Sequence, residues 1–539
     1  MVPKPKKYVC KDCKKEFEYD ELPFLLKAEK GESRPERCLE CKQIHGVERG
    51  KIKVPYFEPI ETGSPVSHFG SSQSGFASRG ERKLEEISKD VDLSEIEFGI
   101  TEKDILAFYE KLENNQVVVV VAPTGSGKST FLPLRLIIPP KGYKGNLIER
   151  LIRQGQIIIT EPLTSAVERI PAFIAEKLLG SKVGPGNMLG LRHGGGKEGE
   201  KYDRWNIEVP VTDGSLRNWI REGKLSQYSL IMVDEAHQRS CNIETILMLL
   251  KNELARYPNL KVVISSATVN AERFRDTFKE VGVKADILNL DHSSRRKHNY
   301  YVHFWRDNQK VSGCGCWLCQ DSKEREKFWR HKKESPKEFE LSETIARFVM
   351  EILQKTKEGS ILVFLHGEAF IEDTAKKIKE MKRINRISES EVPVLTVYRR
   401  LGEAEVERRF NQKGQKGRVL ITTNIAETSH TLDDVVYVID CGYIKESEWD
   451  PATQISKLPS RRHSQDGCRQ RWGRTGRNCD GYVFCLYTEE EFKGFDPHTN
   501  PEITRSCLDE VMLTLSATGV SNPENIPWLV KPEDLSEKK

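Results

Sequence analysis

Two adjacent carboxylates, Asp234 and Glu235, follow an apolar run that ends at Val233. An unpaired charge at the end of a buried strand is costly, so two acids there need partners. A divalent cation and a water molecule are suitable partners if a phosphate-binding site lies elsewhere in the chain. Two solvated acids at a strand end are the alternative interpretation.

A phosphate-binding loop is predicted at residues 122–129, APTGSGKS, because five consecutive valines precede it and a helix-like stretch follows. Glycines let backbone N–H groups turn toward phosphate oxygens, Lys128 supplies a positive charge, and the Ser129 hydroxyl can bind Mg²⁺. Ala122 replaces the first glycine of the general pattern, and a chance glycine-rich turn is the alternative. The residues expected to hold the nucleotide are Thr124, Gly125, Ser126, Gly127, Lys128, Ser129, Thr130, Asp234 and Glu235.

With ATP held by this loop, the two acids have separate tasks. Asp234 is expected to hold Mg²⁺, through water, together with Ser129. Glu235 is expected to orient and deprotonate the attacking water. The sequence therefore predicts ATP and Mg²⁺ as cofactors.

Two groups of cysteines could bind metal. Cys10, Cys13, Cys38 and Cys41 form two CxxC pairs, whose spacing is typical of a closed tetrahedral Zn²⁺ site; free thiols or a redox pair are the alternatives. Cys314, Cys316 and Cys319 form a second group, for which His331 is the candidate fourth ligand. A reduced, partly buried cysteine cluster explains this second group equally well. The proposed ligands are Cys10, Cys13, Cys38, Cys41 and, for the second site, Cys314, Cys316, Cys319 and His331.

Short apolar runs rich in Val and Ile alternate with longer amphipathic stretches, as in parallel α/β sheets. The first set of runs is 117–121, 156–160, 230–233 and 261–265; the second begins at Ser360, Arg418, Val435 and Gly481. Two tandem α/β domains with parallel sheets are the economical interpretation. The expected divisions are a zinc-binding module at 1–55, a Ser/Gly-rich flexible linker at 56–98, domains at 99–289 and 290–500 with a Cys-rich insertion at about 312–335, and a helical tail at 501–539.

The overall composition limits the possible partners and compartment. The chain has 85 Lys and Arg against 81 Asp and Glu in 539 residues, so the net charge does not indicate a nucleic-acid partner. No apolar run approaches the length of a membrane helix, and the polar N-terminus does not resemble a signal peptide. Thirteen cysteines suit reduced thiols and metal ligands, so we expect a cytoplasmic protein.

Several motifs, in order, resemble those of the DEAH-box branch of superfamily 2 RNA helicases. They are the phosphate loop, Asp-Glu-Ala-His at 234–237, Ser-Ala-Thr at 266–268, Thr-Asp-Gly at 212–214, the segment from Asn424, and QRWGRTGR at 470–477. The resemblance covers roughly residues 100–520. It implies two RecA-like domains that enclose ATP, and a catalytic set of Glu235, His237, Gln470, Arg474 and Arg477.

The resemblance assigns roles to further residues. Arg474 and Arg477 would reach the nucleotide as arginine fingers, Gln470 would help to place the water, and Asp433 would contact the nucleotide. His237, Ser266 and Thr268 would couple the nucleotide to the interdomain interface. Candidate contacts to nucleic-acid phosphate and sugar are Thr160, Thr212, Asp213, Gly367, Thr422 and Thr423. After residues 160–162 this chain has Leu-Thr where the family usually has two arginines. This difference weakens the expected binding of the nucleic-acid backbone there.

The function expected from the resemblance is an ATP-dependent, 3′-to-5′ RNA helicase or ribonucleoprotein-remodelling ATPase, acting as a monomer, with an adaptor protein as a possible partner and no membrane association. The chain ends at Lys539, shortly after the second domain, whereas cellular relatives usually continue; ATP hydrolysis is therefore better supported than processive unwinding. A DNA helicase of the same type and a nucleotide-gated scaffold that binds nucleic acid are the alternatives. The intact hydrolytic set argues against the scaffold.

Overall fold

The computed structural model describes residues 99–530, apart from residues 124–125, 141, 196–198, 205, 268–270, 291–297, 307–309, 330–333, 357–358, 428–431 and 520–527. Of the preceding chain it describes only the backbone of two strands, β1 (Lys6–Val9) and β2 (Glu16–Tyr19). The chain divides into two compact units, Met1–Phe69 and Gly70–Lys539.

In the first unit, β1 and β2 pair antiparallel, with Lys6 opposite Tyr19 and Val9 opposite Glu16. The first CxxC pair falls in the sequence between these strands. Cys10, Cys13, Cys38 and Cys41 themselves lie outside the described residues, as does the linker predicted at 56–98. The zinc module and the linker therefore stay predictions.

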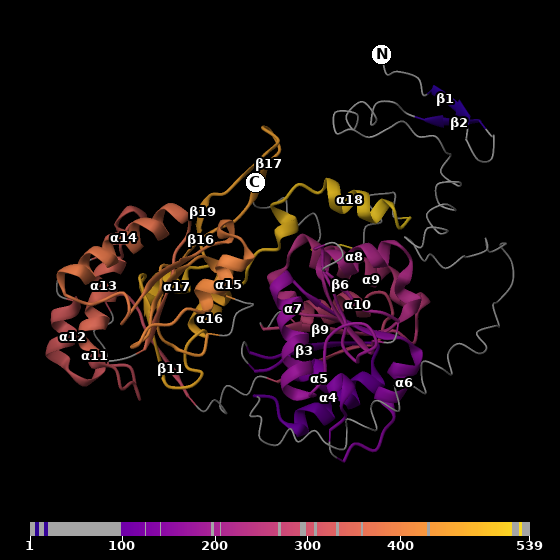
Figure 1. The fold of residues 1–539 in the computed structure, drawn as a ribbon, viewed down its shortest axis with the longest axis horizontal. Helices are drawn as coiled ribbons and strands as arrows, with labels where there is room; N and C mark the ends of the chain where they lie inside the picture. The colour runs from indigo at the N-terminus through magenta and orange to yellow at the C-terminus, as the bar shows by residue number, and fades with distance from the viewer. Residues whose placement is uncertain are drawn as a thin grey trace. The chain divides into compact units, whose positions relative to one another are not determined.

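The second unit contains the predicted pair of α/β domains (Figure 1). The first sheet is parallel throughout except at its β5–β6 edge. In sheet order its strands are β10 (Ala285–Asn289), β3 (Val117–Val121), β9 (Lys261–Ser266), β8 (Tyr228–Val233), β4 (Gln156–Glu161), β7 (Glu208–Thr212), β5 (Leu191–Arg192) and β6 (Glu200–Lys201). The four strands predicted here from apolar runs are confirmed.

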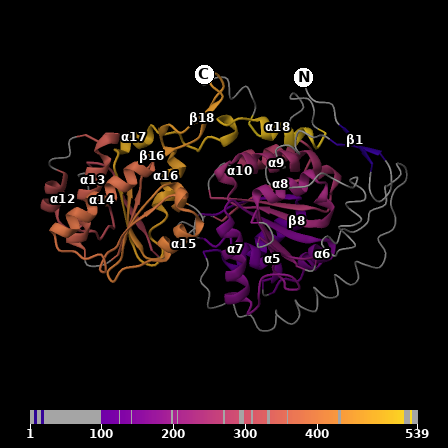
Figure 2. The same cartoon turned by 45° about the horizontal axis from the view of Figure 1, so that its top comes forward.

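Alternate residues of a strand point to opposite faces of a sheet, and β3 shows the result. Val117, Val119 and Val121 join one buried cluster, whereas Val118 and Val120 join another. Figures 1 and 2 show α8, α9 and α10 over one face of this sheet, and α5 and α6 over the other. The helices of the domain are α4 (Glu102–Asn114), α5 (Phe131–Ile137), α6 (Leu147–Gln154), α7 (Thr164–Ala172), α8 (Asp213–Arg221), α9 (Cys241–Glu253) and α10 (Ala271–Lys279).

One buried acid of this domain should make its stability depend on pH. Glu208 in β7 is fully buried, and neither of its carboxylate oxygens has a hydrogen-bond partner among the described residues. Burial raises the pKa of Glu208 from 4.5 to about 8. The folded protein therefore binds a proton more tightly than the unfolded chain, and stability should fall as the pH rises from 4.5 toward 8.

The Glu208→Gln variant removes this titration, so its Tm should exceed that of the native protein at pH 8 and change less between pH 5 and pH 8. In domains of 150–250 residues a gain of 1 kcal/mol corresponds to about 2–4 °C. Thermal unfolding at the two pH values measures this, with exposed Glu110→Gln as the control. Equal pH sensitivity of the native and Glu208→Gln proteins would contradict the prediction.

The second sheet is parallel throughout. In sheet order its strands are β11 (Tyr300–His303), β20 (Gly481–Cys485), β15 (Val435–Asp440), β12 (Ser360–Phe364), β14 (Val419–Thr422) and β13 (Val394–Val397). The four strands predicted here from apolar runs are confirmed, and β11 and β13 lie outside those runs. In both views, α13 and α14 cover one face of the sheet, and α15 and α16 lie on the other (Figure 2).

The helices of the second domain include two in the predicted Cys-rich insertion, α11 (Trp317–Gln320) and α12 (Ser322–Trp329). The others are α13 (Leu341–Lys355), α14 (Glu368–Ile384), α15 (Glu403–Asn411), α16 (Gln465–Trp472) and α17 (Glu489–Lys493). Two nested antiparallel pairs follow: β16 (Tyr443–Lys445) with β19 (Ser460–Arg462) and, between them in sequence, β17 (Glu448–Asp450) with β18 (Ile455–Lys457). Among the described residues, no helix combines the length and apolarity that a membrane crossing requires.

The tail predicted at 501–539 is helical at α18 (Asp509–Ser516). Its Val511 and Leu515 join the buried cluster on the α8 and α9 side of the first sheet. Arg217 of α8 also pairs with Glu510 of α18 at 2.6 Å. The tail therefore completes the core of the first domain, although it follows the second domain in sequence.

Candidate active site

The carboxyl ends of parallel strands meet at one edge of a sheet, and in open α/β sheets ligands bind there. Strands β3, β4, β7, β8 and β9 each end in a segment predicted to be functional. The site is therefore assembled from five loops that are distant in sequence but adjacent in the fold.

The phosphate-binding loop connects β3 to α5. Its Gly127 has a φ of +94°, which L-residues with side chains rarely adopt, and the Gly127 carbonyl accepts a hydrogen bond from Thr130 N–H at 3.1 Å. Ser126 N–H donates to the Pro123 carbonyl at 3.2 Å. Thr124 and Gly125 lie outside the described residues, so their predicted contacts stay predictions.

Lys128, Glu235 and His237 form a buried chain of contacts. Lys128 Nζ lies 2.8 Å from Glu235 Oε1, and Glu235 Oε2 lies 3.1 Å from His237 Nε2. Burial lowers the pKa of Lys128, but the Glu235 and Asp234 carboxylates outweigh it, and the net shift is upward. Burial raises the pKa of Glu235, but Lys128 and His237 outweigh it and lower the pKa to about 2. Lys128 and Glu235 are therefore both charged near neutral pH.

His237 connects Glu235 to the segment after β9. The Ala267 N–H donates to His237 Nδ1 at 3.1 Å, so a neutral ring carries its proton on Nε2, toward Glu235. Burial lowers the pKa of His237 to about 4, and the ring is neutral at physiological pH. Ser266, which precedes Ala267, is fully buried, and its carbonyl accepts from Ala122 N–H at 3.0 Å. Thr268 lies outside the described residues.

The predicted magnesium ligands, Asp234 and Ser129, lie at the same place. Asp234 is fully buried; burial and Glu235 raise its pKa, whereas Lys128 and the Ser129 side chain partly offset the rise. Asp234 Oδ1 accepts from Glu235 N–H at 2.8 Å. Within the described residues, Asp234 Oδ2 has no hydrogen-bond partner. A buried, unpartnered carboxylate oxygen beside a hydroxyl fits Mg²⁺ with its shell of water.

Two further acids extend this cluster, and only one was anticipated. Burial is the largest cause that raises the pKa of Glu161, at the end of β4, and Asp234, Glu235 and Asp213 raise it further. Burial likewise raises the pKa of Asp213, and the Thr160 hydroxyl partly offsets this rise. The resulting pKa of Asp213 is about 6. Glu161 was not predicted to belong to the site, although an acid that ends an isoleucine-rich strand was a usable signal.

The second domain brings Arg474 and Gln470 to this cluster. Arg474 is almost fully buried, and burial lowers its pKa to about 9, with a further lowering from Arg477 and opposite effects from Glu235 and Glu427. The charge of Arg474 also lowers the pKa of Lys128, Glu235 and His237. Arg474 therefore acts electrostatically on three buried residues of the first domain, Lys128, Glu235 and His237.

A pocket lies between the two domains at this point. It is lined by His237, Arg239, Phe274, Asp466, Gln470, His498 and Thr499. Gln470 and His237 thus line the same pocket, and the predicted role of Gln470 in placing the water stays a prediction. Arg477 Nη1 lies 4.0 Å from Asp433 Oδ1, and the Asp433 side chain is 57% exposed. Arg477 therefore lies between Arg474 and the more exposed Asp433. The charge of Arg477 lowers the pKa of Arg474.

A buried network that the sequence analysis missed holds Arg474 in place. Arg471 Nε donates to Glu427 Oε1 at 2.7 Å, and its Nη1 donates to Asp440 Oδ1 at 2.9 Å. Tyr487 Oη donates to Asp440 Oδ2 at 2.7 Å, and Arg474 donates to the Glu427 carbonyl. Asp440 at the end of an apolar strand was the available signal. The network fixes the end of α16 and hence the position of Arg474.

The nucleic-acid candidates divide by exposure. Thr160, Asp213 and Thr422 are buried, so in this conformation they offer no surface to a strand. Thr160 lies in β4, Thr422 is the last residue of β14, and Asp213 begins α8 directly after β7. Thr212, Gly367 and Thr423 are partly exposed and stay candidates. Gly367 has a φ of +90° at the start of α14, beside Lys445.

The Cys-rich insertion brings Cys314, Cys316 and Cys319 together, as its spacing suggested. The fourth side chain there is His303 of β11, which the sequence analysis did not consider. His331, the residue proposed for that place, lies outside the described residues.

Comparisons with known proteins match both domains. The family described as DEAD/DEAH box helicase matches residues 104–277, and the helicase conserved C-terminal domain matches residues 344–479. The chain is 32% identical over 432 residues to the ATP-dependent RNA helicase HrpA of Escherichia coli, covering 80% of this chain and 29% of that protein. It is 31% identical to the probable ATP-dependent RNA helicase DHX35 homolog of Caenorhabditis elegans, covering 78% and 52%.

Among solved structures, the crystal structure of the DEAH/RHA helicase HrpB of Escherichia coli matches with a TM-score of 0.62 and 26% identity, covering 81% of this chain and 48% of that chain. The chain therefore spans about a third to a half of the length of these relatives. Two tandem RecA-like domains with a phosphate loop and paired acids define the class of nucleotide-dependent helicase cores. Within this class, the chain belongs to the DEAD/DEAH box helicases, with the Asp-Glu-Ala-His sequence at 234–237.

Proposed function

We propose that this protein is an ATP-dependent RNA helicase or ribonucleoprotein-remodelling ATPase. The observation that carries the proposal is the assembly of Lys128, Asp234 and Glu235 from the first domain with Arg474 from the second. Relatives named as RNA helicases support RNA as the substrate class. The 3′-to-5′ polarity, the cytoplasmic location, the monomeric state and an adaptor partner stay predictions.

The first step is an exchange of partners at Lys128. A triphosphate in the loop competes with Glu235 for the Lys128 ammonium, because phosphate oxygens bind a lysine point charge strongly. Lys128 is the first of the groups that lower the pKa of Glu235, so its departure lets that pKa rise. Glu235 then becomes a better acceptor for a proton from water. His237 Nε2 lies 3.1 Å from the other carboxylate oxygen.

The second step places positive charge at the transferred phosphoryl group. Mg²⁺ bound at Asp234 and Ser129 would neutralise charge on the phosphate oxygens. Arg474 supplies a planar guanidinium from the other domain, and Gln470 supplies an amide near His237. Because the groups come from two domains, hydrolysis requires the domains to be together, and their separation after hydrolysis provides the motion.

ATP turnover with single-stranded RNA, single-stranded DNA or no nucleic acid tests the proposal. We expect RNA to increase turnover severalfold more than DNA of the same length and sequence. Greater stimulation by DNA would favour the DNA helicase instead. Binding of ATP without turnover under any of these conditions would favour the nucleotide-gated scaffold and contradict the proposal.

We further propose that Cys10, Cys13, Cys38 and Cys41 hold one Zn²⁺ and that this module selects the target. The support is their spacing, together with the placement of the first pair in sequence between two antiparallel strands. In a segment this small, the metal would provide much of the folding free energy, with apparent values of about 10–16 kcal/mol known for zinc-finger peptides.

A further inference from the structure

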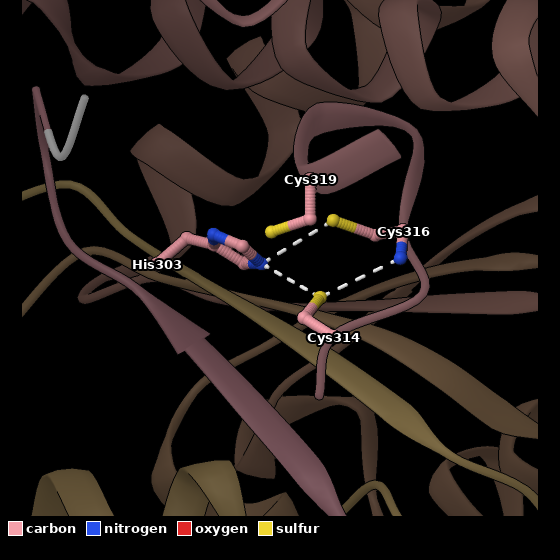
Figure 3. Close-up of side chains that lie close together, drawn as sticks. All are labelled: His303, Cys314, Cys316 and Cys319. Atoms are coloured by element: carbon pink, nitrogen blue, oxygen red, sulfur yellow. Dashed lines mark hydrogen bonds between the residues drawn. The ribbon is translucent and has the colours of Figure 1, made fainter. Parts of the chain in front are cut away.

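The second domain contains a compact group of four metal-binding side chains, drawn in Figure 3. Cys314, Cys316, Cys319 and His303 are each at most 6% exposed, and one ligand atom from each lies within 4.8 Å of all the others. His303 is the last residue of β11, whereas the cysteines belong to the insertion that follows. The four residues meet only in the folded domain.

The distances suit coordination of one ion. His303 Nε2 lies 3.5 Å from Cys314 Sγ and 3.4 Å from Cys316 Sγ. With Zn–S of about 2.3 Å and Zn–N of about 2.0–2.1 Å, a tetrahedral site places nitrogen and sulfur about 3.5 Å apart. In Figure 3 the three sulfurs and the imidazole edge point toward a common centre.

Hydrogen bonding alone explains the group less well. A neutral imidazole nitrogen has one lone pair, so two thiols cannot both donate to Nε2 with good geometry. The Cys316 N–H lies 3.5 Å from Cys314 Sγ and donates to it, a contact that stabilises a thiolate. Three buried sulfurs and one imidazole nitrogen are a ligand set that prefers Zn²⁺.

The surroundings indicate a structural role for the ion. His303 stacks on Phe484 of the neighbouring strand at 5.4 Å, so its ring is fixed by the sheet. Close by, Trp317 and Phe328 of the insertion pack at 5.1 Å, and Phe328 packs against Phe348 of α13 at 4.8 Å. An ion bound by His303 and the cysteines would tie this aromatic insertion to the edge strand β11.

We propose that His303, Cys314, Cys316 and Cys319 bind one structural Zn²⁺ that clamps the insertion onto the second domain. Four protein ligands leave no position for water or substrate, so the site is closed and not catalytic. This site is separate from the N-terminal cysteine module and does not depend on the proposed RNA helicase activity.

Zinc content of the purified full-length chain tests the proposal. To remove the other candidate site, Cys10, Cys13, Cys38 and Cys41 are replaced by serine, and we expect one equivalent of zinc to remain. Adding His303→Ala should remove that equivalent, whereas adding His303→Cys should retain it through a fourth thiolate. Exposed Cys479→Ser is the matched control and should leave the metal content unchanged.

Cobalt exchange gives a second readout that does not depend on activity. Co²⁺ in the serine-substituted chain should show the visible absorption of tetrahedral thiolate coordination, and Cys314→Ser should abolish it. A folded chain that contains no zinc and gives no cobalt spectrum would overturn the proposal, leaving a reduced cysteine cluster. Unchanged zinc after His303→Ala, measured also in the chain with its native N-terminus, would exclude His303 as a ligand.

Discussion

The Glu235→Gln variant should bind ATP but hydrolyse it about 10²–10⁴ times more slowly than the native protein, with or without RNA. Glutamine keeps the size of the side chain and can still accept a hydrogen bond from Lys128, but it cannot take a proton from water. Glu235 lies 2.8 Å from Lys128 and 3.1 Å from His237, so its carboxylate is already aligned in the loop. General-base removal alone costs about 10²–10⁴ in rate, which sets the scale of the expected loss.

Steady-state phosphate release and equilibrium ATP binding measure the two parts of this prediction. Exposed Glu272→Gln, on α10 of the same domain, is the matched control and should keep native turnover. Equal turnover in Glu235→Gln and native protein would remove Glu235 from the mechanism. Loss of ATP binding would instead show that Glu235 serves the fold of the loop.

The Arg474→Ala variant should lose about a thousandfold or more in the rate of the chemical step, while ATP affinity changes little. Arginine fingers increase the rate of hydrolysis about 10³–10⁵-fold, because the guanidinium stabilises negative charge that develops only in the transition state. Burial has lowered the pKa of Arg474 to about 9, so the group remains charged at neutral pH. The low exposure also means that little water screens its charge from the reacting phosphate.

Single-turnover hydrolysis of bound ATP isolates this effect from binding and release. Arg408→Ala is the control, because Arg408 lies on an exposed face of α15 in the same domain and pairs with Glu405. Arg474 also donates to the Glu427 carbonyl, so the thermal stability of each variant is measured in parallel. A native rate for folded Arg474→Ala would contradict the assigned role.

The parts of the site that sequence predicted are those carried by short, continuous segments. The loop around Lys128 and the acids at 234 and 235 each follow a buried strand, so local pattern sufficed to place them. Four strands in each sheet were predicted, because runs of Val and Ile buried on both faces leave a clear signature.

The parts that sequence missed depend on contacts between distant segments. Arg471 meets Asp440 and Glu427 across separations of 31 and 44 residues, and only the completed sheet brings them together. His303 meets the cysteines because β11 pairs with β20, a pairing that no local pattern encodes. Motif position likewise did not predict that Thr160 would be buried at the end of β4.

In the proposed mechanism, Lys128 of one domain and Arg474 of the other act on the same triphosphate. The most direct measurement is the affinity of native, Arg474→Ala and Arg408→Ala proteins for ADP with aluminium fluoride and Mg²⁺, beside their affinity for ADP alone. Arg474→Ala should weaken binding of the transition-state mimic at least about a hundredfold and leave ADP affinity nearly unchanged. Equal affinity of Arg474→Ala and native protein for the mimic would contradict a shared site.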